Sequence, residues 1–201
     1  MTEIRTRIVL TKNAEMNFRA VALMVFGGLL LLTFFSGSYQ PTVGVEIGDR
    51  APKIESYLLD GTSFDSRNLE GKMVLIDFWA SYDASSRVES YGKKMLLERY
   101  GNGRFVNSDS FVIVSISLDR FKTPLYQVIE RDELYDFYHL CDFMGGESEL
   151  AAMFEVGGEM MDYLIDGNGR IVAKSKDLAG ISAALEKLEA FDGSRYARNQ
   201  R

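Results

Sequence analysis

The sequence of 201 residues has a single cysteine, Cys141, and a single histidine, His139. One thiol excludes an intramolecular disulfide, a dithiol redox cycle within one chain and a zinc site built from several thiolates. The pair His139 and Cys141 supplies two ligands on one segment, which do not define a metal site. No glycine-rich phosphate loop is present, because the Gly-Asn-Gly at 167–169 fits a turn between strands. We therefore predict no metal and no cofactor.

Basic residues are too few to suggest a polyanionic ligand. The chain has 23 Lys and Arg against 29 Asp and Glu, a formal net charge of −6, and residues 39–201 alone carry −8. No basic patch or helix stands out to offset repulsion by phosphates, so binding to nucleic acid is disfavoured. What the sequence does have is 46% hydrophobic residues. That is enough for one globular domain with a sizeable core and an appendage.

The appendage is residues 1–38, which we predict to be a signal peptide or a signal anchor. Four basic residues precede an uncharged apolar run at 20–35. As a helix this run would span about 24 Å, somewhat less than the roughly 30 Å hydrocarbon core, so cleavage and retention both stay open. Translation from Met16 would give a more compact basic region before the run. The basic residues precede it and none directly follow, which favours a domain outside the cytoplasmic membrane and membrane contact only through this segment.

The remaining chain divides into three predicted parts: a linker and lead-in segment at 39–50, a globular domain at 51–191, and a flexible tail at 192–201. Strands are expected at 72–80, 111–119, 162–166 and 170–174. The first two are long apolar runs rich in β-branched residues, which is typical of parallel strands buried on both faces. The last two flank Gly-Asn-Gly, so one edge of the sheet should be an antiparallel hairpin. Asp60-Gly61 predicts another hairpin before the first long strand.

Amphipathic segments between the strands predict helices at 85–101, 124–132, 148–156 and 181–191. The first places Val88, Tyr91, Met95 and Leu96 on one apolar side. Its start has two candidate caps, Asp83 and a capping box formed by Ser86 and Glu89. Strands alternating with helices predict an α/β fold: a central mixed sheet with parallel core strands, an antiparallel edge hairpin and helices on both faces.

Five blocks in order carry a resemblance to a known family. They are VEIGDRAPKIE, NLEGKMVLIDFWASYDASSR, FVIVSISLD, FYHLCD and SELAAMFEVGGEMMDYLIDGNGRIVAK. Together they resemble the extracytoplasmic thioredoxin-like thiol:disulfide oxidoreductases, a group that grades into the alkyl hydroperoxide reductase and thiol-specific antioxidant (redoxin) class. The resemblance implies a thioredoxin-like domain at 51–191.

The family's W-C-x-x-C motif falls on Tyr82, Asp83, Ala84, Ser85 and Ser86, so both sulfur positions are empty. Asp83 can use the field at a helix N-terminus and Ser86 can cap, but neither can exchange with a disulfide. The family's cis-proline falls on Met160, and the prolines of this chain, at 41, 52 and 124, lie elsewhere. A cis bond before a non-proline residue costs on the order of 3 kcal/mol, so we predict a trans bond there.

Asp77 is expected as a remnant of the family's chemistry. Asp77 stands where the family has an acidic residue that assists proton transfer to the thiols, and a carboxylate within a buried strand should be partly buried with a raised pKa. Asp77, Asp83 and Asp119 are expected to converge near the strand ends. Cys141 is expected at a strand edge or end, away from the active-site turn, as an inert small hydrophobe.

These features predict a redox-inactive thioredoxin-fold protein of the cell envelope. It would bind an extended segment of another extracytoplasmic protein at the former active-site surface, with no catalytic residue. The candidate binding residues are Trp79, Tyr82, Gly158, Met160 and Met161; the two methionines serve equally well as core fillers. The alternative is a thiol-disulfide oxidoreductase or peroxiredoxin-like antioxidant activity that uses Cys141 with a partner thiol. The oligomeric state is left open.

Overall fold

The structure, a computed structural model, describes residues 41–157 and 159–189. The predicted leader at 1–38, Gly158 and the predicted tail at 192–201 lie outside the described residues. Among those described, no helix combines the length and the apolar character needed to cross a membrane. The anchor prediction concerns residues 20–35 and stays a prediction.

The strands are β1 (Glu55–Tyr57), β2 (Ser63–Asp65), β3 (Met73–Trp79), β4 (Phe111–Ser117), β5 (Tyr138–Leu140), β6 (Asp162–Ile165) and β7 (Ile171–Ser175). The helices are α2 (Ala84–Tyr100), α3 (Lys122–Arg131), α4 (Glu149–Met153) and α5 (Leu178–Leu188), with the short 3-10 helices η1 (Ser66–Leu69) and η2 (Gly145–Glu147). The main sheet has the order β5-β4-β3-β6-β7, and β1 and β2 form a separate hairpin. Strands β3, β4 and β5 are parallel, whereas β6 and β7 form the predicted antiparallel edge.

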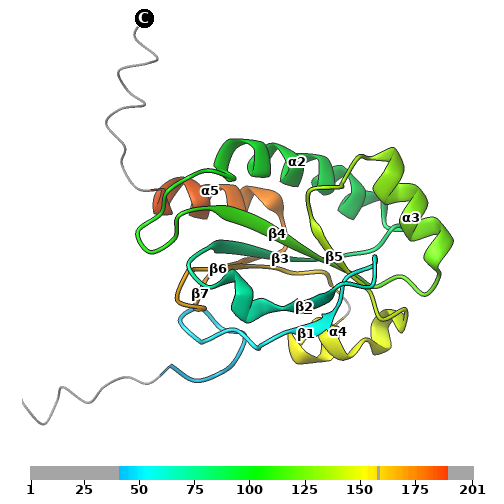
Figure 1. Cartoon of the computed structure of the whole chain (residues 1–201), viewed down its shortest axis with the longest axis horizontal. Helices are drawn as coiled ribbons and strands as arrows, with labels where there is room; N and C mark the ends of the chain where they lie inside the picture. The colour runs from blue at the N-terminus through cyan, green and yellow to red at the C-terminus, as the bar shows by residue number, and fades with distance from the viewer. Residues whose placement is uncertain (1–40, 158, 190–201) are drawn as a thin grey trace, which may run out of the picture. The chain divides into compact units, whose positions relative to one another are not determined.

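Helices cover both faces of the main sheet, as predicted. In Figure 1, α2 and α5 lie above the sheet and the β1–β2 hairpin and α4 lie below it. Strand β3 is central, and all seven of its residues are buried. Because side chains alternate along a strand, Val74, Ile76 and Phe78 belong to the core on the hairpin side. Met73, Leu75 and Trp79 belong to the core on the helix side.

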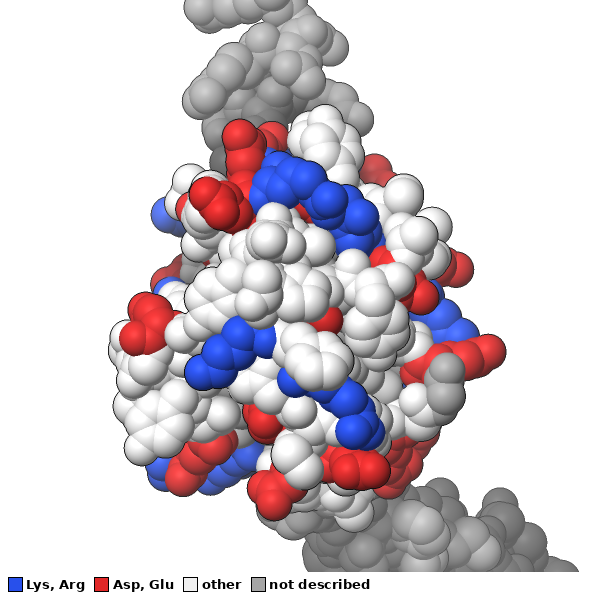
Figure 2. All heavy atoms as spheres, turned by 90° about the vertical axis from the view of Figure 1, so that its right-hand side faces the viewer, with Lys and Arg blue, Asp and Glu red and all other residues white. Residues whose placement is uncertain are grey.

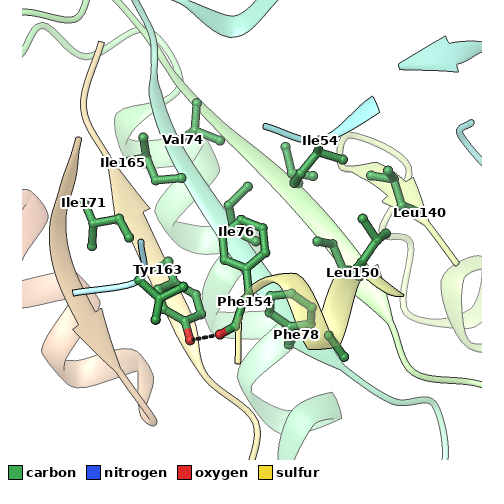
Figure 3. Packing of buried hydrophobic residues seen from close by; sticks show 14 of the residues in the cluster. Ile54, Val74, Ile76, Phe78, Leu140, Leu150, Phe154, Tyr163, Ile165 and Ile171 are labelled. Carbon is green, nitrogen blue, oxygen red and sulfur yellow. Dashed lines mark hydrogen bonds between the residues drawn. The ribbon is translucent and has the colours of Figure 1, made fainter. Parts of the chain in front are cut away.

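Figure 3 shows the core on the hairpin side. It packs aliphatic residues of β3 and β4 against α4 and the segment before β1. Phe78, Phe154 and Tyr163 meet at ring-centroid distances of 5.3 to 6.3 Å. The Tyr163 hydroxyl donates a 2.7 Å hydrogen bond to the Phe154 carbonyl oxygen. A buried hydroxyl is thereby satisfied, and α4 is tied to β6.

Helix α2 buries a different face from the one that its apolar residues predict. Val88, Tyr91 and Met95 are exposed, at 76%, 68% and 47% of their surface, and of the predicted set only Leu96 is buried. The buried positions of the helix are Ser86, Ser90, Lys93, Leu96 and Tyr100. The predicted apolar side is therefore wrong. The reason is Asp77 of β3, whose buried carboxylate points toward α2. The helix therefore buries the face that carries Lys93, the partner of Asp77.

The other elements depart from the predictions mainly at their ends. Helix α5 begins at Leu178 rather than at 181, because the Asp177 side chain accepts a hydrogen bond from the Gly180 backbone N–H and caps it. The β6–β7 hairpin forms as predicted but shifts register between Leu164 and Ile165. Within the predicted lead-in segment 39–50, Val45 is 5% exposed and belongs to the core. The folded unit thus begins before residue 51.

The face that α2 buries can be tested by two truncations on one helix. We expect Leu96→Ala to lower the free energy of unfolding by about 2–5 kcal/mol, because a buried leucine leaves a cavity. Val88→Ala should change it by less than about 0.5 kcal/mol, because Val88 is exposed. Urea unfolding followed by circular dichroism measures both. Equal losses in the two variants would contradict the observed orientation of the helix.

Candidate functional site

The turn after β3 is fixed by one buried carboxylate. Asp119, at the end of β4, accepts a 2.9 Å hydrogen bond from the Ser81 backbone N–H and a 2.6 Å bond from the Ser81 hydroxyl. The Ser117 hydroxyl donates to the same carboxylate at 2.6 Å. The next residue, Tyr82, is 72% exposed. The turn therefore presents Tyr82 to solvent while its base is held within the fold.

Helix α2 starts directly after this turn, with Asp83 as its cap. The Asp83 carboxylate accepts a 2.7 Å hydrogen bond from the Ser86 backbone N–H. This bond lowers the pKa of Asp83, and the helix macrodipole favours the same negative charge. Of the two predicted caps, Asp83 is the correct one. Ser86 lies inside the helix, and Glu89 reaches toward Lys93 instead of closing a capping box.

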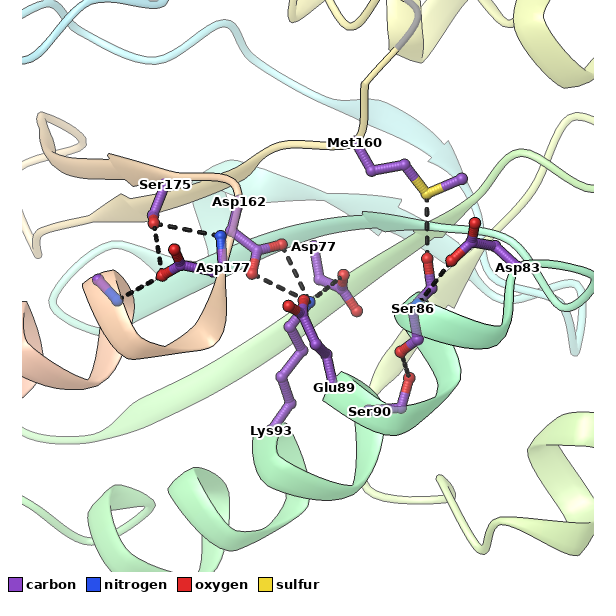
Figure 4. Close-up of polar contacts among 11 residues, drawn as sticks. Asp77, Asp83, Ser86, Glu89, Ser90, Lys93, Met160, Asp162, Ser175 and Asp177 are labelled. Atoms are coloured by element: carbon purple, nitrogen blue, oxygen red, sulfur yellow. Dashed lines mark hydrogen bonds and ion pairs between the residues drawn. The ribbon is translucent and has the colours of Figure 1, made fainter.

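Met160, in the loop before β6, contacts the start of α2. The Ser86 hydroxyl donates to the Met160 sulfur at 3.2 Å, as Figure 4 shows. The described residues contain no cis peptide bond, so the predicted trans bond before Met160 is confirmed. Met160 packs beside the core on the helix side, whereas Met161 packs beside the core on the hairpin side. The two methionines thus have different surroundings, and only Met160 adjoins the start of α2.

A buried ionic cluster centres on Lys93, about two turns beyond Ser86 along α2. The Lys93 ammonium nitrogen is 2.7 Å from Asp77 Oδ1, 3.1 Å from Asp162 Oδ1, 3.0 Å from Asp162 Oδ2 and 3.7 Å from Glu89 Oε2. The side chains of Lys93, Asp77 and Asp162 are between 1% and 4% exposed, and that of Glu89 is 26% exposed. Figure 4 shows these groups from α2, β3 and β6 pointing toward one another. Three carboxylates surround one ammonium group.

The excess of negative charge sets the protonation of this cluster. Burial, and then repulsion by Asp77, raise the pKa of Asp162 to about 8, although Lys93 opposes the shift. For Lys93, burial disfavours the charged form, but attraction by Asp77 and Asp162 outweighs it and raises the pKa. The charged form of Lys93 is therefore favoured, and so is the protonated form of Asp162.

A cavity of about 340 Å³ opens beside this cluster and the helix start. Its charged lining residues are Asp83, Glu89, Lys93, Glu159, Asp162 and Lys176. Phe78 and Met160 supply apolar wall, and Ser85 and Ser86 line the side formed by the helix start. Glu159 and Lys176 form an ion pair with each other. No group of three or more potential metal ligands with suitable geometry occurs in the described part of the chain.

The structure separates several residues that the sequence grouped together. Trp79 is 1% exposed within the core, so its predicted place on a binding surface is wrong. Asp77, Asp83 and Asp119 do not form one acidic centre. Asp77 pairs with Lys93, Asp83 caps α2 and Asp119 holds the turn.

Cys141 lies just beyond β5, where its thiol donates to the Asp119 carbonyl oxygen at 3.4 Å. Asp119 also holds Ser81, so the thiol is closer to the turn after β3 than the sequence suggested. It is nevertheless absent from the lining of the cavity beside Met160. Burial raises the pKa of Cys141, which favours the protonated thiol. His139 places Nε2 2.6 Å from the Leu134 carbonyl oxygen, a structural contact.

Lys93, Glu89 and Asp162 are the site residues that the sequence reasoning missed. The sequence did contain a signal for Lys93. It follows Ser86 by seven residues, about two helical turns, so the two side chains lie on the same face of α2. A carboxylate within a buried strand such as Asp77 also requires a buried cation or a proton. Pairing these two facts would have pointed to Lys93. Asp162 required the sheet order, which brings β6 next to β3.

Comparisons with known proteins agree with this geometry. No protein-family model matches the chain. In sequence it is similar to the thiol-disulfide oxidoreductase ResA of Bacillus cereus, with 22% identity over 163 residues, which cover 81% of this chain and 88% of that protein. ResA of Oceanobacillus iheyensis is 22% identical over 179 residues, covering 87% of this chain and 85% of that protein.

Solved structures show the same relationship. The thioredoxin domain of a thiol-disulfide oxidoreductase from Bacteroides vulgatus matches with a TM-score of 0.63 and 24% identity, covering 73% of this chain and 100% of that one. A thioredoxin-like protein from Parabacteroides distasonis matches with a TM-score of 0.57 and 28% identity, covering 73% of this chain and 99% of that one. The predicted thioredoxin-like α/β fold is confirmed.

The protonation of Asp162 predicts a specific pH dependence of stability. A carboxyl group whose pKa is raised on folding binds more protons in the folded state, so its contribution to stability is lost as the pH rises from about 4 to about 8. Relative to Asp162→Asn, the wild type should lose at most about 1.4 kcal/mol per pH unit in this range. Urea unfolding at pH 5, 7 and 9 measures the difference, with Glu130→Gln as the control. A difference that does not change with pH would contradict the assignment.

Paired cysteines test the geometry at the helix start. In a Cys141→Ala background, we expect Asp83→Cys with Ser86→Cys to form an intramolecular disulfide, because the two positions lie one helical turn apart. Thiol titration should find two thiols after reduction and none after oxidation, with the chain still monomeric on a denaturing gel. The single variant Asp83→Cys is the control. Oxidation that yields only cross-linked dimers would show that the turn differs from the one described.

Proposed function

We propose that this member of the thioredoxin-like thiol-disulfide oxidoreductase family is a redox-inactive protein of the cell envelope that binds an extended segment of another protein. The binding surface would comprise Tyr82, Asp83 and Met160, and the neighbouring Gly158 falls outside the described residues. The observation that carries the proposal is the contact between Ser86 and Met160. It supports a site that has kept the juxtaposition of helix start and facing loop with side chains that cannot exchange disulfides.

Exposed hydrophobic residues that follow β3, β4 and β5 support a binding surface at these strand ends. Tyr82, Phe121 and Met144 follow β3, β4 and β5 and are 72%, 72% and 49% exposed. Large exposed hydrophobic residues that gather on one side of a protein often mark interaction sites. Figure 2 shows the side on which α3 lies, where uncharged side chains cover the centre and charges of both signs lie among them. A mixed, largely uncharged face suits a protein segment better than a polyanion.

The chemistry of the side chains argues against thiol exchange within the chain. Asp83 and Ser86 carry no sulfur, and thiol-disulfide exchange requires attack by a thiolate. Cys141 is the only thiol in the sequence. Its raised pKa and its hydrogen bond to Asp119 favour the unreactive thiol form.

The proposal places the domain outside the cytoplasmic membrane, in the periplasm, exported or anchored by residues 1–38. Its support is the pattern of basic residues before the apolar run at 20–35. The partner would then be another extracytoplasmic protein.

A second candidate is a thiol-disulfide oxidoreductase or peroxiredoxin-like activity in which Cys141 acts with a thiol of a partner. Two observations support this candidate. The similar proteins are named thiol-disulfide oxidoreductases, and Asp119 links Cys141 to Ser81 at the turn.

Site-directed photo-crosslinking tests the binding proposal. A photoreactive amino acid replaces Tyr82 in the full chain, produced in its own cells, and the control replaces Val106, which is 85% exposed in the loop after α2. We expect discrete products at position 82 that are absent at position 106, with mass spectrometry assigning the crosslinked segment. No product at position 82, or identical products at both positions, would reject the proposed surface.

A turnover assay separates the two candidate functions. We expect neither the wild type nor Cys141→Ala to accelerate insulin reduction by dithiothreitol or the consumption of hydrogen peroxide. Activity in the wild type that disappears in Cys141→Ala would replace the binding proposal with the thiol-based one. A thioredoxin with both active-site cysteines is the positive control for insulin reduction, and a peroxiredoxin is the positive control for peroxide consumption.

A further inference from the structure

We infer that the cavity beside Met160 accepts a positively charged side chain, an ammonium or guanidinium group, from the bound segment. The inference names the chemistry of the partner and rests on the proposed function for the existence of that segment. The preference for a cation follows from the groups that line the cavity. These groups differ from the exposed aromatic surface around Tyr82.

The floor of the cavity carries uncompensated negative charge. Asp77, Asp162 and Glu89 all lie within 3.7 Å of the Lys93 ammonium nitrogen. Even while Asp162 holds its proton, the carboxylates of Asp77 and Glu89 outnumber the single ammonium of Lys93, and in a poorly solvated site the excess of negative charge is costly. At the rim, Lys176 is already paired with Glu159. Asp83 adds a further negative charge at the helix start.

Once it loses its proton, Asp162 also offers an acceptor that points to a ligand. The residue is 3% exposed and lines the cavity. Lys93 donates its hydrogen bond to Oδ1, and Oδ2, although 3.0 Å from the ammonium nitrogen, accepts no hydrogen bond. Buried polar atoms are nearly always hydrogen-bonded. Ammonium and guanidinium groups have only donors, so either can use this oxygen without introducing an unmatched acceptor.

The walls of the cavity match the rest of a lysine or arginine side chain. Phe78 and Met160 line it beside the acidic groups. Lysine and arginine place their methylene stems against apolar surface and direct the charged group to a polar end. A volume of about 340 Å³ lies near the lower limit for small-molecule pockets. One side chain is therefore an appropriate occupant.

An anion is the main competing ligand, because α2 begins at this cavity and helix N-termini attract negative charge. That position is already taken by Asp83, whose carboxylate accepts the hydrogen bond from the Ser86 backbone N–H. An anion would then face Glu89 and Glu159 as well. His139, which Asp77 influences electrostatically, adds no positive charge because burial lowers its pKa. The facing groups therefore favour a cation over an anion.

Binding of a cation should release the proton that Asp162 holds. The pKa of Asp162 is raised to about 8 by burial and by repulsion from Asp77. Below that pH the bound cation has to displace the proton, and near or above it the carboxylate is already charged. Affinity for a lysine side chain should therefore rise from pH 6 to pH 8, where lysine itself remains charged.

Blocked amino acids test the cavity without the proposed partner. The full chain, in a neutral detergent and labelled at the methionine methyl groups, is titrated with Nα-acetyl-lysine methylamide and its uncharged analogue Nα-acetyl-norleucine methylamide. The Met160 methyl resonance, assigned by its loss in Met160→Leu, is the readout, and the resonance of the exposed Met153 is the control. We expect a saturable shift at Met160 with the lysine derivative and at least tenfold weaker binding of the norleucine derivative.

Two variants and one control locate the charge. Asp162→Asn and Glu89→Gln should each weaken binding of the lysine derivative at least threefold, whereas Glu130→Gln on α3 should not change it. Affinity should rise at least threefold from pH 6 to pH 8 in the wild type and stay constant in Asp162→Asn. Equal binding of the norleucine derivative, tighter binding of Nα-acetyl-glutamate methylamide, or unchanged affinity in both variants would overturn the inference.

The two experiments distinguish a failure of the proposed function from a failure of the proposed cation site. If the lysine derivative binds as expected but photo-crosslinking at position 82 gives no discrete product, the cation site stands and the proposed function fails. If crosslinking identifies a segment but the cavity shows no preference for the lysine derivative, the proposed function stands and this inference fails.

Discussion

The buried ammonium of Lys93 is the interaction on which the arrangement of the site depends. It joins β3, α2 and β6, because Asp77 and Asp162 have both been taken out of water and each requires a positive partner or a proton. Removing one member of a buried ion pair commonly costs about 3–5 kcal/mol. The position of the cluster explains why α2 turns its polar residues inward and leaves Val88 and Tyr91 in solvent. An electrostatic requirement outweighs the apolar pattern of that helix.

The turn after β3 and the start of α2 are held by carboxylates and hydroxyls. Asp119 binds both the backbone and the hydroxyl of Ser81, and Asp83 satisfies the first turn of α2. The contact from Ser86 to Met160 then connects the helix start with the loop before β6. None of these contacts needs a thiol. A thioredoxin-like fold can therefore form this turn and helix start without a thiol, and the fold alone does not establish the function.

The sequence was most informative where a local pattern determines the structure. The apolar runs of β3 and β4 predicted buried parallel strands, and Gly-Asn-Gly at 167–169 predicted the edge hairpin. It was least informative where partners come from distant segments. The face of α2 depends on Asp77, and the proton on Asp162 depends on the pairing of β6 with β3. The same reasoning placed Trp79 on a binding surface because a sequence motif does not show burial. The exposure of Tyr82 could be predicted because the residue lies in the turn directly before the capped start of α2.

The burial of Trp79 also gives the molecule an optical property. It is the only tryptophan in the sequence, is 1% exposed, and lies on the same side of β3 as Asp77, two residues away. Its indole emission therefore comes from one apolar environment next to the ionic cluster. Tryptophan emission, excited selectively over that of the ten tyrosines, is therefore a signal from a single site beside the charges under the cavity and requires no attached dye.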